Sequence, residues 1–222
     1  MKSKKTRERI LDASLELFNQ KKASNVSTVQ ISAAMKISPG NLYYYYANKE
    51  DVIRCIWEER MSSVLKELLK KTEQIKSSAD VLDFIRESLE YMIEYRFFFT
   101  EISTLFINDD KLIEIYREAD QEIRDTFNDA IDRDFKAGKL VKHDEVTRTL
   151  VVQNAIAAAK QMLDNYDVYM ANGVSAEDFI GYCWIRIIAV LETIFSDDMK
   201  EEMNKELEAR GFNKERYLEL SR

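Results

Sequence analysis

Proline and glycine are almost absent from this chain, and their scarcity restricts the folds open to it. The 222 residues contain one proline, Pro39, and five glycines, four of which follow Lys49. Tight turns between strands draw heavily on these two residue types. From Lys49 onward the apolar residues recur almost throughout at helical spacing. The sequence therefore excludes a strand-rich domain and predicts an all-α fold.

The helices of this fold can be placed approximately from their spacing and stop signals. Gly138 and Gly173 stand where helix-ending glycines are expected. The charged segment 199–222 is predicted to form a short helix pair or a mobile tail. The length accommodates a small domain, residues 1–50, and a larger helical domain, residues 51–222. The helices predicted from Lys49 onward cover residues 49–76, 80–95, 97–107, 110–137, 144–171 and 175–196.

Pro39 marks the start of a short helix near the N-terminus. Ser38 is a favoured N-cap residue, and a proline at the first helical position loses no hydrogen bond. Gly40 follows in the first turn, where it costs roughly 1 kcal/mol relative to alanine. A glycine there suggests that another surface, such as a DNA backbone or a base edge, comes close to the helix.

A second short helix is predicted directly before this one. Ser27 is its N-cap, and Gln30 stands three residues later, where a capping box requires it. Residues 36 and 37 separate this helix from Ser38, and a helix over residues 5–20 precedes both. Two short helices joined by a turn of three or four residues form a helix-turn-helix, whose second helix enters the major groove of DNA. The sequence thus predicts an N-terminal three-helix domain that binds DNA.

The same stretches resemble a known family. In order they read RILDASLELF at 9–18, STVQIS at 27–32 and ISPGNLYYYYANKE at 37–50. They closely resemble the N-terminal domain of TetR-family transcriptional regulators over about residues 5–60. Three positions depart from the family pattern: Lys22 replaces a helix-ending glycine, Met35-Lys36-Ile37 replaces an Ala-Gly-Val turn, and Pro39 replaces a basic or polar residue. The resemblance implies a homodimeric repressor that a small molecule releases from a double-stranded operator.

The resemblance also assigns roles around the run of four tyrosines. Leu42 and Tyr46 lie four residues apart and are predicted to pack on the first helix. Lys49 has an alternative role as the first residue of the next helix, with Asn48 as its N-cap. The predicted phosphate contacts are Thr28, Tyr43, Tyr45 and Lys49, the predicted base contacts are Gly40, Asn41 and Tyr44, and Ser38 and Pro39 complete the predicted DNA-binding site.

Charge divides the chain in a way that suits this assignment. Residues 1–57 hold ten Lys or Arg and five Asp or Glu, a balance of +5, so a net charge of −7 leaves −12 for the remainder. Binding through the basic end would weaken steeply with salt, because it releases counterions from DNA. Lys2, Lys4, Lys5, Arg7 and Arg9 form either an N-terminal arm that contacts DNA or a solvated tail.

Two sets of residues in the larger domain suggest its partners. Apolar residues spread widely around the helices at 146–170 and 179–195, which favours a four-helix dimer interface over a purely intramolecular core. The predicted interface comprises Ala155, Ala159, Met162, Tyr166, Ile187 and Leu191. Aromatic residues also gather where the family usually forms its effector pocket, although such residues often serve as core. The predicted pocket comprises Tyr91, Tyr95, Phe98, Phe106, Tyr116 and Trp184, and the effector is unknown.

Other classes of function find little support in the sequence. His143 is the only histidine, and Cys55 and Cys183 are isolated, without the spacing of a metal site. No Gly-rich phosphate loop and no apolar run long enough for a membrane span are present. We therefore expect a cytoplasmic protein that is neither an enzyme nor dependent on a cofactor. A helical dimer that binds another protein, without specific operator binding, is the alternative.

Overall fold

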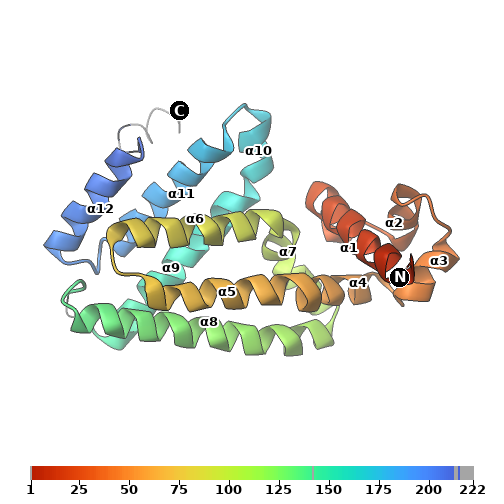
Figure 1. The fold of residues 1–222 in the computed structure, drawn as a ribbon, viewed down its shortest axis with the longest axis horizontal. Helices are drawn as coiled ribbons and strands as arrows, with labels where there is room; N and C mark the ends of the chain where they lie inside the picture. Colours follow the sequence, from red (N-terminus) through yellow and green to blue (C-terminus); the bar gives the residue numbers. More distant parts are fainter. Residues whose placement is uncertain (1, 142, 213–214, 216–222) are drawn as a thin grey trace. The chain divides into compact units, whose positions relative to one another are not determined.

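The computed structural model describes residues 2–141, 143–212 and 215, and their regular elements are all helical (Figure 1). A single antiparallel bridge joins Leu140 and Phe195, and no β-strand occurs in the described part of the chain. The predicted all-α fold is confirmed. The chain divides into two compact units: unit 1 combines residues 1–67 with 94–120, and unit 2 combines residues 68–93 with 121–222.

Unit 1 contains the N-terminal helices and a later segment that packs on them. Figure 1 shows α1, α2 and α3 grouped together. Its elements are α1 (Lys2–Lys21), the short 3₁₀-helix η1 (Ala23–Asn25), α2 (Thr28–Ala34), α3 (Pro39–Tyr45), α4 (Lys49–Ile56), the π-helical turn η2 (Trp57–Met61), the first part of α5 (Ser62–Lys71), α7 (Arg96–Ile107) and the first part of α8 (Asp110–Lys136).

The caps predicted for α2 and α3 are confirmed. The Ser27 hydroxyl accepts the Gln30 N–H, and the Gln30 side chain accepts the Ser27 N–H in return. The Ser38 hydroxyl accepts the Asn41 N–H at 3.2 Å, with Pro39 at the start of the helix. These contacts satisfy N–H groups that a helix start leaves unpaired. The orientation of both short helices is therefore encoded locally.

The core of unit 1 joins α7 to the N-terminal helices. Ile10 and Phe18 of α1 are fully buried, and the Phe18 ring lies 5.2 Å from that of Phe97. The Asn19 side chain donates to the Glu94 carbonyl at 2.7 Å and accepts the Phe97 N–H at 3.1 Å, so α1 caps the start of α7. Residues 94–120 thus share one core with the N-terminal helices, whereas the sequence predicted a domain boundary after residue 50.

Unit 2 is built around α11. The Trp184 side chain is fully buried and donates to the Leu82 carbonyl at 2.9 Å, and Phe179 and Met203 are also fully buried. Its elements are the end of α5, η3 (Thr72–Gln74), α6 (Ser78–Glu94) up to Ile93, α8 from Gln121, α9 (Glu145–Asp164), α10 (Tyr166–Ala171), α11 (Ala176–Leu191) and α12 (Asp197–Ala209).

Two predicted helices differ in detail from those in the structure. The helix predicted over 144–171 breaks at Asn165, where φ is −104° and ψ is 1°. The bend lets Tyr166 and Tyr169 of α10 pack on Phe179, with ring separations of 5.0 and 5.6 Å. The helix predicted over 49–76 contains the π-helical turn at 57–61 and ends as α5 at Lys71. The prediction of one helix over 144–171 was wrong because tertiary packing overrides a continuous helical pattern, whereas residues 49–71 remain continuously helical through the π-helical turn.

The ends of the later helices follow the sequence signals closely. Gly138 and Gly173 have φ of 77° and 80°, the left-handed conformation that a helix-ending glycine adopts readily. The predicted C-terminal segment begins as the single helix α12, and Phe212 packs on Trp184 with a ring separation of 5.6 Å. The rest of the prediction for 199–222 lies outside the described residues, apart from residue 215.

Candidate nucleic-acid interface and ligand cavity

The four consecutive tyrosines separate into different environments on α3. Tyr46 is 1% exposed and donates its hydroxyl to the Arg7 carbonyl at 3.2 Å, which confirms its predicted place in the core together with Leu42. Tyr44 is 77% exposed and Tyr43 is 51% exposed. Burial raises the pKa of Tyr46, so its hydroxyl remains a hydrogen-bond donor at any physiological pH. The exposed tyrosines leave α3 with a polar and aromatic outer face.

Three of the predicted phosphate contacts lie around one open hollow. The Thr28 hydroxyl and the Tyr43 hydroxyl are 2.9 Å apart, which joins α2 to α3 at the surface. Thr28, Tyr43 and Lys49 line the same hollow of about 500 Å³. Tyr45 is half-buried instead, with its ring edge-on to Tyr44 at 5.0 Å. Sequence positions up to 21 residues apart are thus brought to one surface.

Lys49 also holds the turn that precedes α2. Its ammonium donates to the Ala23 carbonyl at 2.7 Å. From α7, the buried carboxylate of Glu101 accepts the Ala23 N–H and the Ser24 hydroxyl. The peptide groups of η1 are therefore fixed on both sides, by a cation from α4 and an anion from α7. The alternative role of Asn48 as N-cap of α4 is also present, since its side chain accepts the Asp51 N–H at 2.7 Å.

The predicted N-terminal arm is a helix for most of its length. α1 begins at Lys2, and the Arg7 guanidinium pairs with Glu59 and lies 5.3 Å from the centre of the Tyr46 ring. The pairing with Arg7 lowers the pKa of Glu59. Arg7 is thus committed to a contact within unit 1, and its predicted place in a free arm was wrong. The side chains of Lys2 and Lys4 lie outside the described residues.

The two lysines that replace family glycines both adopt left-handed backbone. Lys22, at the end of α1, has φ of 66° and ψ of 141°, and Lys36, between α2 and α3, has φ of 55°. Non-glycine residues in such regions cost about 1–3 kcal/mol and occur mostly at functional sites. Backbone strain is therefore present in the segment that precedes the helix-turn-helix and in the turn between its two helices.

We expect Lys22→Gly to raise the free energy of unfolding by about 1 kcal/mol, because glycine adopts this conformation without strain and loses only part of the gain to its freer unfolded chain. Urea denaturation followed by circular dichroism measures the change. Lys21→Gly, one residue earlier in α1, is the matched control and should lower stability by up to about 1 kcal/mol. Equal effects of the two substitutions would show that Lys22 is not strained.

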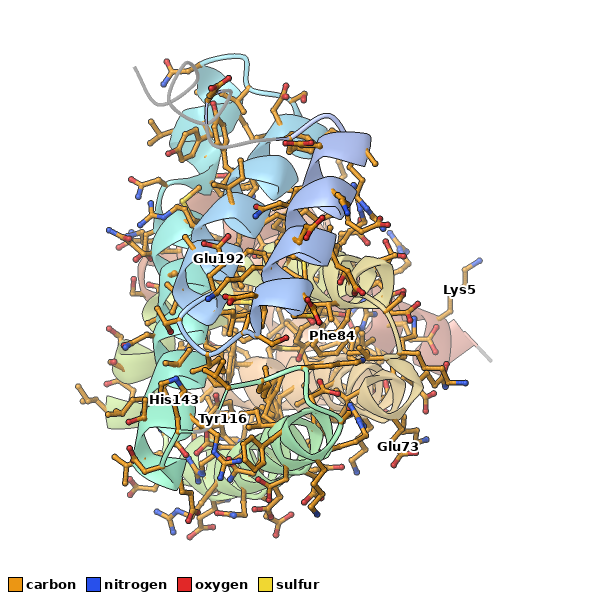
Figure 2. The ribbon with its side chains drawn as sticks, turned by 90° about the vertical axis from the view of Figure 1, so that its left-hand side faces the viewer. Lys5, Glu73, Phe84, Tyr116, His143 and Glu192 are labelled. Carbon is orange, nitrogen blue, oxygen red and sulfur yellow. The ribbon has the colours of Figure 1, made fainter. Side chains whose placement is uncertain are left out.

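Unit 2 contains an apolar cavity of about 210 Å³ between α6, α8, α9 and α11. Phe84 of α6 and Phe127 of α8 both line it and contact each other edge to face, with ring centres 6.1 Å apart. Figure 2 shows Phe84 among the side chains between the helices, whereas Glu73 projects outward. The charged residues of its lining are Arg133, Asp134 and Lys139. A cavity of this character is the usual form of a small-molecule site.

None of the six predicted pocket residues lines this cavity. Phe98, Phe106 and Tyr116 pack on one another in unit 1 and, through Phe98 and Tyr116, on Trp57. In unit 2, Tyr91 and Trp184 are buried in the core, and Tyr95 is buried in unit 1. In the structure these six residues pack against other side chains of their own unit, as the alternative of core packing predicted.

Most of the predicted interface residues are buried within one chain. Ala155, Ala159 and Ile187 are 4–7% exposed and line the cavity with Leu191, and Met162 is 2% exposed. Tyr166 is half-buried and packs on Phe179. These faces of α9 and α11 point into unit 2, because the cavity and α6 lie there. On the opposite side of α9, Val146 and Leu150 are 66% and 51% exposed.

The cavity residues on α8 were missed by sequence reasoning. α8 is rich in charge and reads as a solvated helix. The sequence signal that could have revealed its buried side is an apolar stripe at intervals of four residues, which comprises Ile123, Phe127, Ile131 and Phe135. Such a stripe marks one buried face of a helix.

None of the described helices combines the length and apolar character that crossing a membrane requires.

Comparisons with known proteins identify the family. Residues 10–55 match the family model described as bacterial regulatory proteins of the tetR family, and residues 58–201 match the one described as a bacterial transcriptional repressor. The HTH-type transcriptional regulator AcrR of Shigella flexneri is 33% identical over 92 residues, which cover 41% of this chain and 42% of that protein. This match spans less than half of the relative's length.

Solved structures share the fold over most of the chain. A TetR-family transcriptional regulator from Marinobacter aquaeolei VT8 has a TM-score of 0.76 at 24% identity, covering 92% of this chain and 98% of its own. The ketosteroid transcriptional regulator KstR2 of Mycobacterium tuberculosis has a TM-score of 0.69 at 12% identity, covering 86% and 96%. A complex of SmeT with triclosan has a TM-score of 0.59 at 18% identity, covering 87% and 93%. With its helix-turn-helix and its family matches across both units, the chain belongs to the TetR family of DNA-binding transcriptional regulators.

Proposed function

We propose that this regulator is a repressor that binds its operator as a homodimer and is released by a small-molecule effector. The DNA-binding part of this proposal rests on the outer face of α3, where Gly40, Asn41 and Tyr44 are all exposed. No heavy atom lies within 4 Å of the position a Cβ would take at Gly40, beyond its neighbours and its own helix. Nothing in the described structure explains why this helix carries a glycine there, which favours an external surface as the reason.

The contacts with DNA divide between positioning and reading. Thr28, Tyr43 and Lys49 lie around the open hollow and would donate to phosphate oxygens, which fix the register of a protein on the duplex. Asn41 and Tyr44 would contact base edges from the outer face of α3, and Gly40 would allow the helix to approach them closely. Tyr45, Ser38 and Pro39 complete the proposed surface, the latter two at the start of α3.

We expect Gly40→Ala to separate DNA binding from stability. The added methyl meets open space in the free protein, so the free energy of unfolding should rise by up to about 0.5 kcal/mol through helix propensity. Operator affinity should fall by about tenfold, because the methyl holds α3 away from the groove. A filter-binding or anisotropy titration at fixed salt measures the affinity, and thermal melting measures the stability.

Two further variants make this test specific. Ser103→Ala, on an exposed position of α7, should change neither operator affinity nor stability. Asn41→Ala should change the preferred sequence rather than the affinity for all DNA. If Gly40→Ala and Asn41→Ala both bind the operator like the parent protein, the outer face of α3 is not the reading surface.

A homodimer would supply two reading surfaces to one operator. Val146 and Leu150 lie four residues apart on the exposed side of α9, and Ala157 follows on the same side. On α11, Ala189 is also exposed. Small and apolar residues on two packed helices allow the close approach of a second copy. Successive major grooves along one face of DNA are roughly 34–36 Å apart, which a two-fold pair of reading helices can match.

One experiment tests the operator and the dimer together. Fragments of the source genome are selected by binding to the protein and then sequenced. We expect an inverted repeat whose half-sites lie about one helical turn apart, and repression of a neighbouring gene in a reporter assay. Selected fragments without a shared inverted repeat would argue against a dimeric operator-binding protein. Activation of the reporter would argue against repression.

An enzymatic role receives no support from the thiols. Burial raises the pKa of Cys55 to about 11 and that of Cys183 to about 12, so both stay protonated at neutral pH. A thiolate, not a thiol, is the reactive form. The thiols thus supply no nucleophile, and a DNA-binding regulator of this family is placed in the cytoplasm by its operator. Its effector would occupy the apolar cavity of unit 2, whose lining is more apolar than that of the other described pockets.

A further inference from the structure

The size of the cavity in unit 2 limits what it can hold. Its volume is about 210 Å³. An engineered apolar cavity of about 150 Å³ binds benzene, so the space in unit 2 corresponds to one substituted ring or a short branched chain. Larger fused-ring molecules would extend beyond this space. The cavity therefore favours a small ligand with an apolar body.

The hydroxyls that line the cavity are already used as donors. Ser88 donates to the Phe84 carbonyl at 2.8 Å, and Thr72 donates to the Leu69 carbonyl at 2.8 Å. The rest of the uncharged lining is apolar side chains. An acceptor group of a ligand would thus find no uncharged donor free in the lining, and only the positively charged residues are left to bind it.

Arg133 provides the donor that the lining otherwise lacks. Its Nη2 atom is buried and has no hydrogen-bond partner in the described structure, while the side chain as a whole is 39% exposed. Its Nε lies 3.7 Å from the Asp134 carboxylate, and that carboxylate also lies 3.9 Å from the Lys139 ammonium. The Lys139 ammonium is further held by the Lys76 carbonyl at 2.9 Å. A buried donor without a partner is unfavourable, and a ligand acceptor that satisfies it is favoured accordingly.

The net positive charge of these three lining residues favours a ligand group that is negatively charged. Arg133 and Lys139 contribute two positive charges and Asp134 one negative charge, so the lining carries a balance of +1. Arginine pairs with carboxylates through two parallel hydrogen bonds, which gives both strength and a fixed orientation. The apolar body attached to a carboxylate bound by Arg133 would lie among the apolar side chains that line the rest of the cavity.

We propose that unit 2 binds a small carboxylic acid of single-ring size, with its carboxylate on Arg133 Nη2 and its apolar body between α6 and α8. The proposal rests on the proposed function only in naming this ligand as the effector. Direct binding to the purified full-length protein tests the ligand class by itself. Operator release by the same ligand tests the regulatory role.

Isothermal titration calorimetry with three matched probes provides the binding test. The probes are 4-ethylbenzoate, its amide 4-ethylbenzamide and the cation 4-ethylbenzylamine. We expect the carboxylate to bind at least about tenfold more tightly than the amide, and the amine to bind most weakly. Arg133→Gln should weaken carboxylate binding by about ten- to a hundredfold, the range for a hydrogen bond to a charged group, and amide binding by less than about threefold.

Two controls separate these effects from a loss of folding. Arg124→Gln, an exposed arginine on the same helix that does not line the cavity, should leave all three affinities unchanged. Ala155→Leu fills the cavity from α9 and should abolish binding of both benzoate and amide. Circular dichroism and thermal melting must show a folded protein for each variant.

Arg133→Lys should restore part of the carboxylate affinity that Arg133→Gln loses, since it keeps the charge but not the paired hydrogen bonds.

Each outcome decides one claim. The ligand class is overturned if no probe binds, if the amide equals the carboxylate, or if Arg133→Gln leaves carboxylate affinity unchanged. If the carboxylate binds through Arg133 but leaves the affinity for the selected operator unchanged, the ligand class stands and the effector role fails. If the carboxylate both binds through Arg133 and weakens operator binding, both stand.

Discussion

Trp184→Ala should lower the free energy of unfolding of unit 2 by about 3–5 kcal/mol, the range for removing a large buried aromatic side chain. The indole is fully buried at the centre of the unit and donates to the Leu82 carbonyl. The guanidinium groups of Arg86 and Arg210 lie 4.7 and 5.4 Å from its ring. Alanine would leave a large cavity, and would remove the hydrogen bond to the Leu82 carbonyl and both cation–π contacts. Urea denaturation followed by far-ultraviolet circular dichroism measures the loss.

A series at the same helix separates the contributions. Trp184→Phe keeps an aromatic ring but removes the hydrogen bond, so it should cost about 1–3 kcal/mol. Ala189→Ser, on an exposed position of α11, should stay within about 0.5 kcal/mol of the parent protein. If Trp184→Ala unfolds at the same urea concentration as Ala189→Ser, Trp184 is not central to the core, and its predicted place in a ligand pocket becomes the better description.

Glu101→Ala should be nearly as damaging, but in unit 1. Its carboxylate accepts the Ala23 N–H and the Ser24 hydroxyl in η1, and the side chain is 7% exposed. Alanine would leave the N–H of the buried Ala23 without a partner, so we expect a loss of about 2–4 kcal/mol. Operator affinity should fall as well, because η1 leads directly into α2 and Thr28.

Trp57 allows this loss to be measured in unit 1 alone. Trp57 and Trp184 are the two tryptophans of the chain, and they lie in different units. In a Trp184→Phe background, the fluorescence of Trp57 reports only on unit 1. Glu101→Gln should retain an acceptor for the Ala23 N–H and lose about half as much stability. Glu114→Ala, an exposed residue of α8 in unit 1, should have almost no effect, and equal results for Glu101→Ala and Glu114→Ala would contradict the role of η1.

The sequence predicted best what is decided within a few residues. The capping box at Ser27 and the Ser38-Pro39 start depend on side chains that contact backbone atoms three residues away. The separation of Tyr46 from Tyr44 follows from helix geometry on a short helix with one buried side. These features need no knowledge of distant segments, so the helix-turn-helix could be predicted almost completely.

The interior of unit 2 could not be predicted in the same way. α11 is apolar on nearly every side, and nine of its residues are buried, so periodicity could not say which side faces α6 and which faces another chain. Ala155 and Ile187 were therefore assigned to a dimer interface, whereas they line a cavity. The break at Asn165 has no proline or glycine to mark it, and the contacts that stabilise it come from Phe179 on another helix.

The origin of unit 1 in two separate stretches of chain has a consequence for protein engineering. Residues 94–120 belong to it through Asn19, Glu101 and the Phe18–Phe97 contact. A chimaera that transfers only residues 1–67 to another regulator would leave η1 without its carboxylate and α1 without the aromatic surface that covers it. A grafted reading domain must carry both stretches, or its recipient must already possess an acidic residue at the position of Glu101.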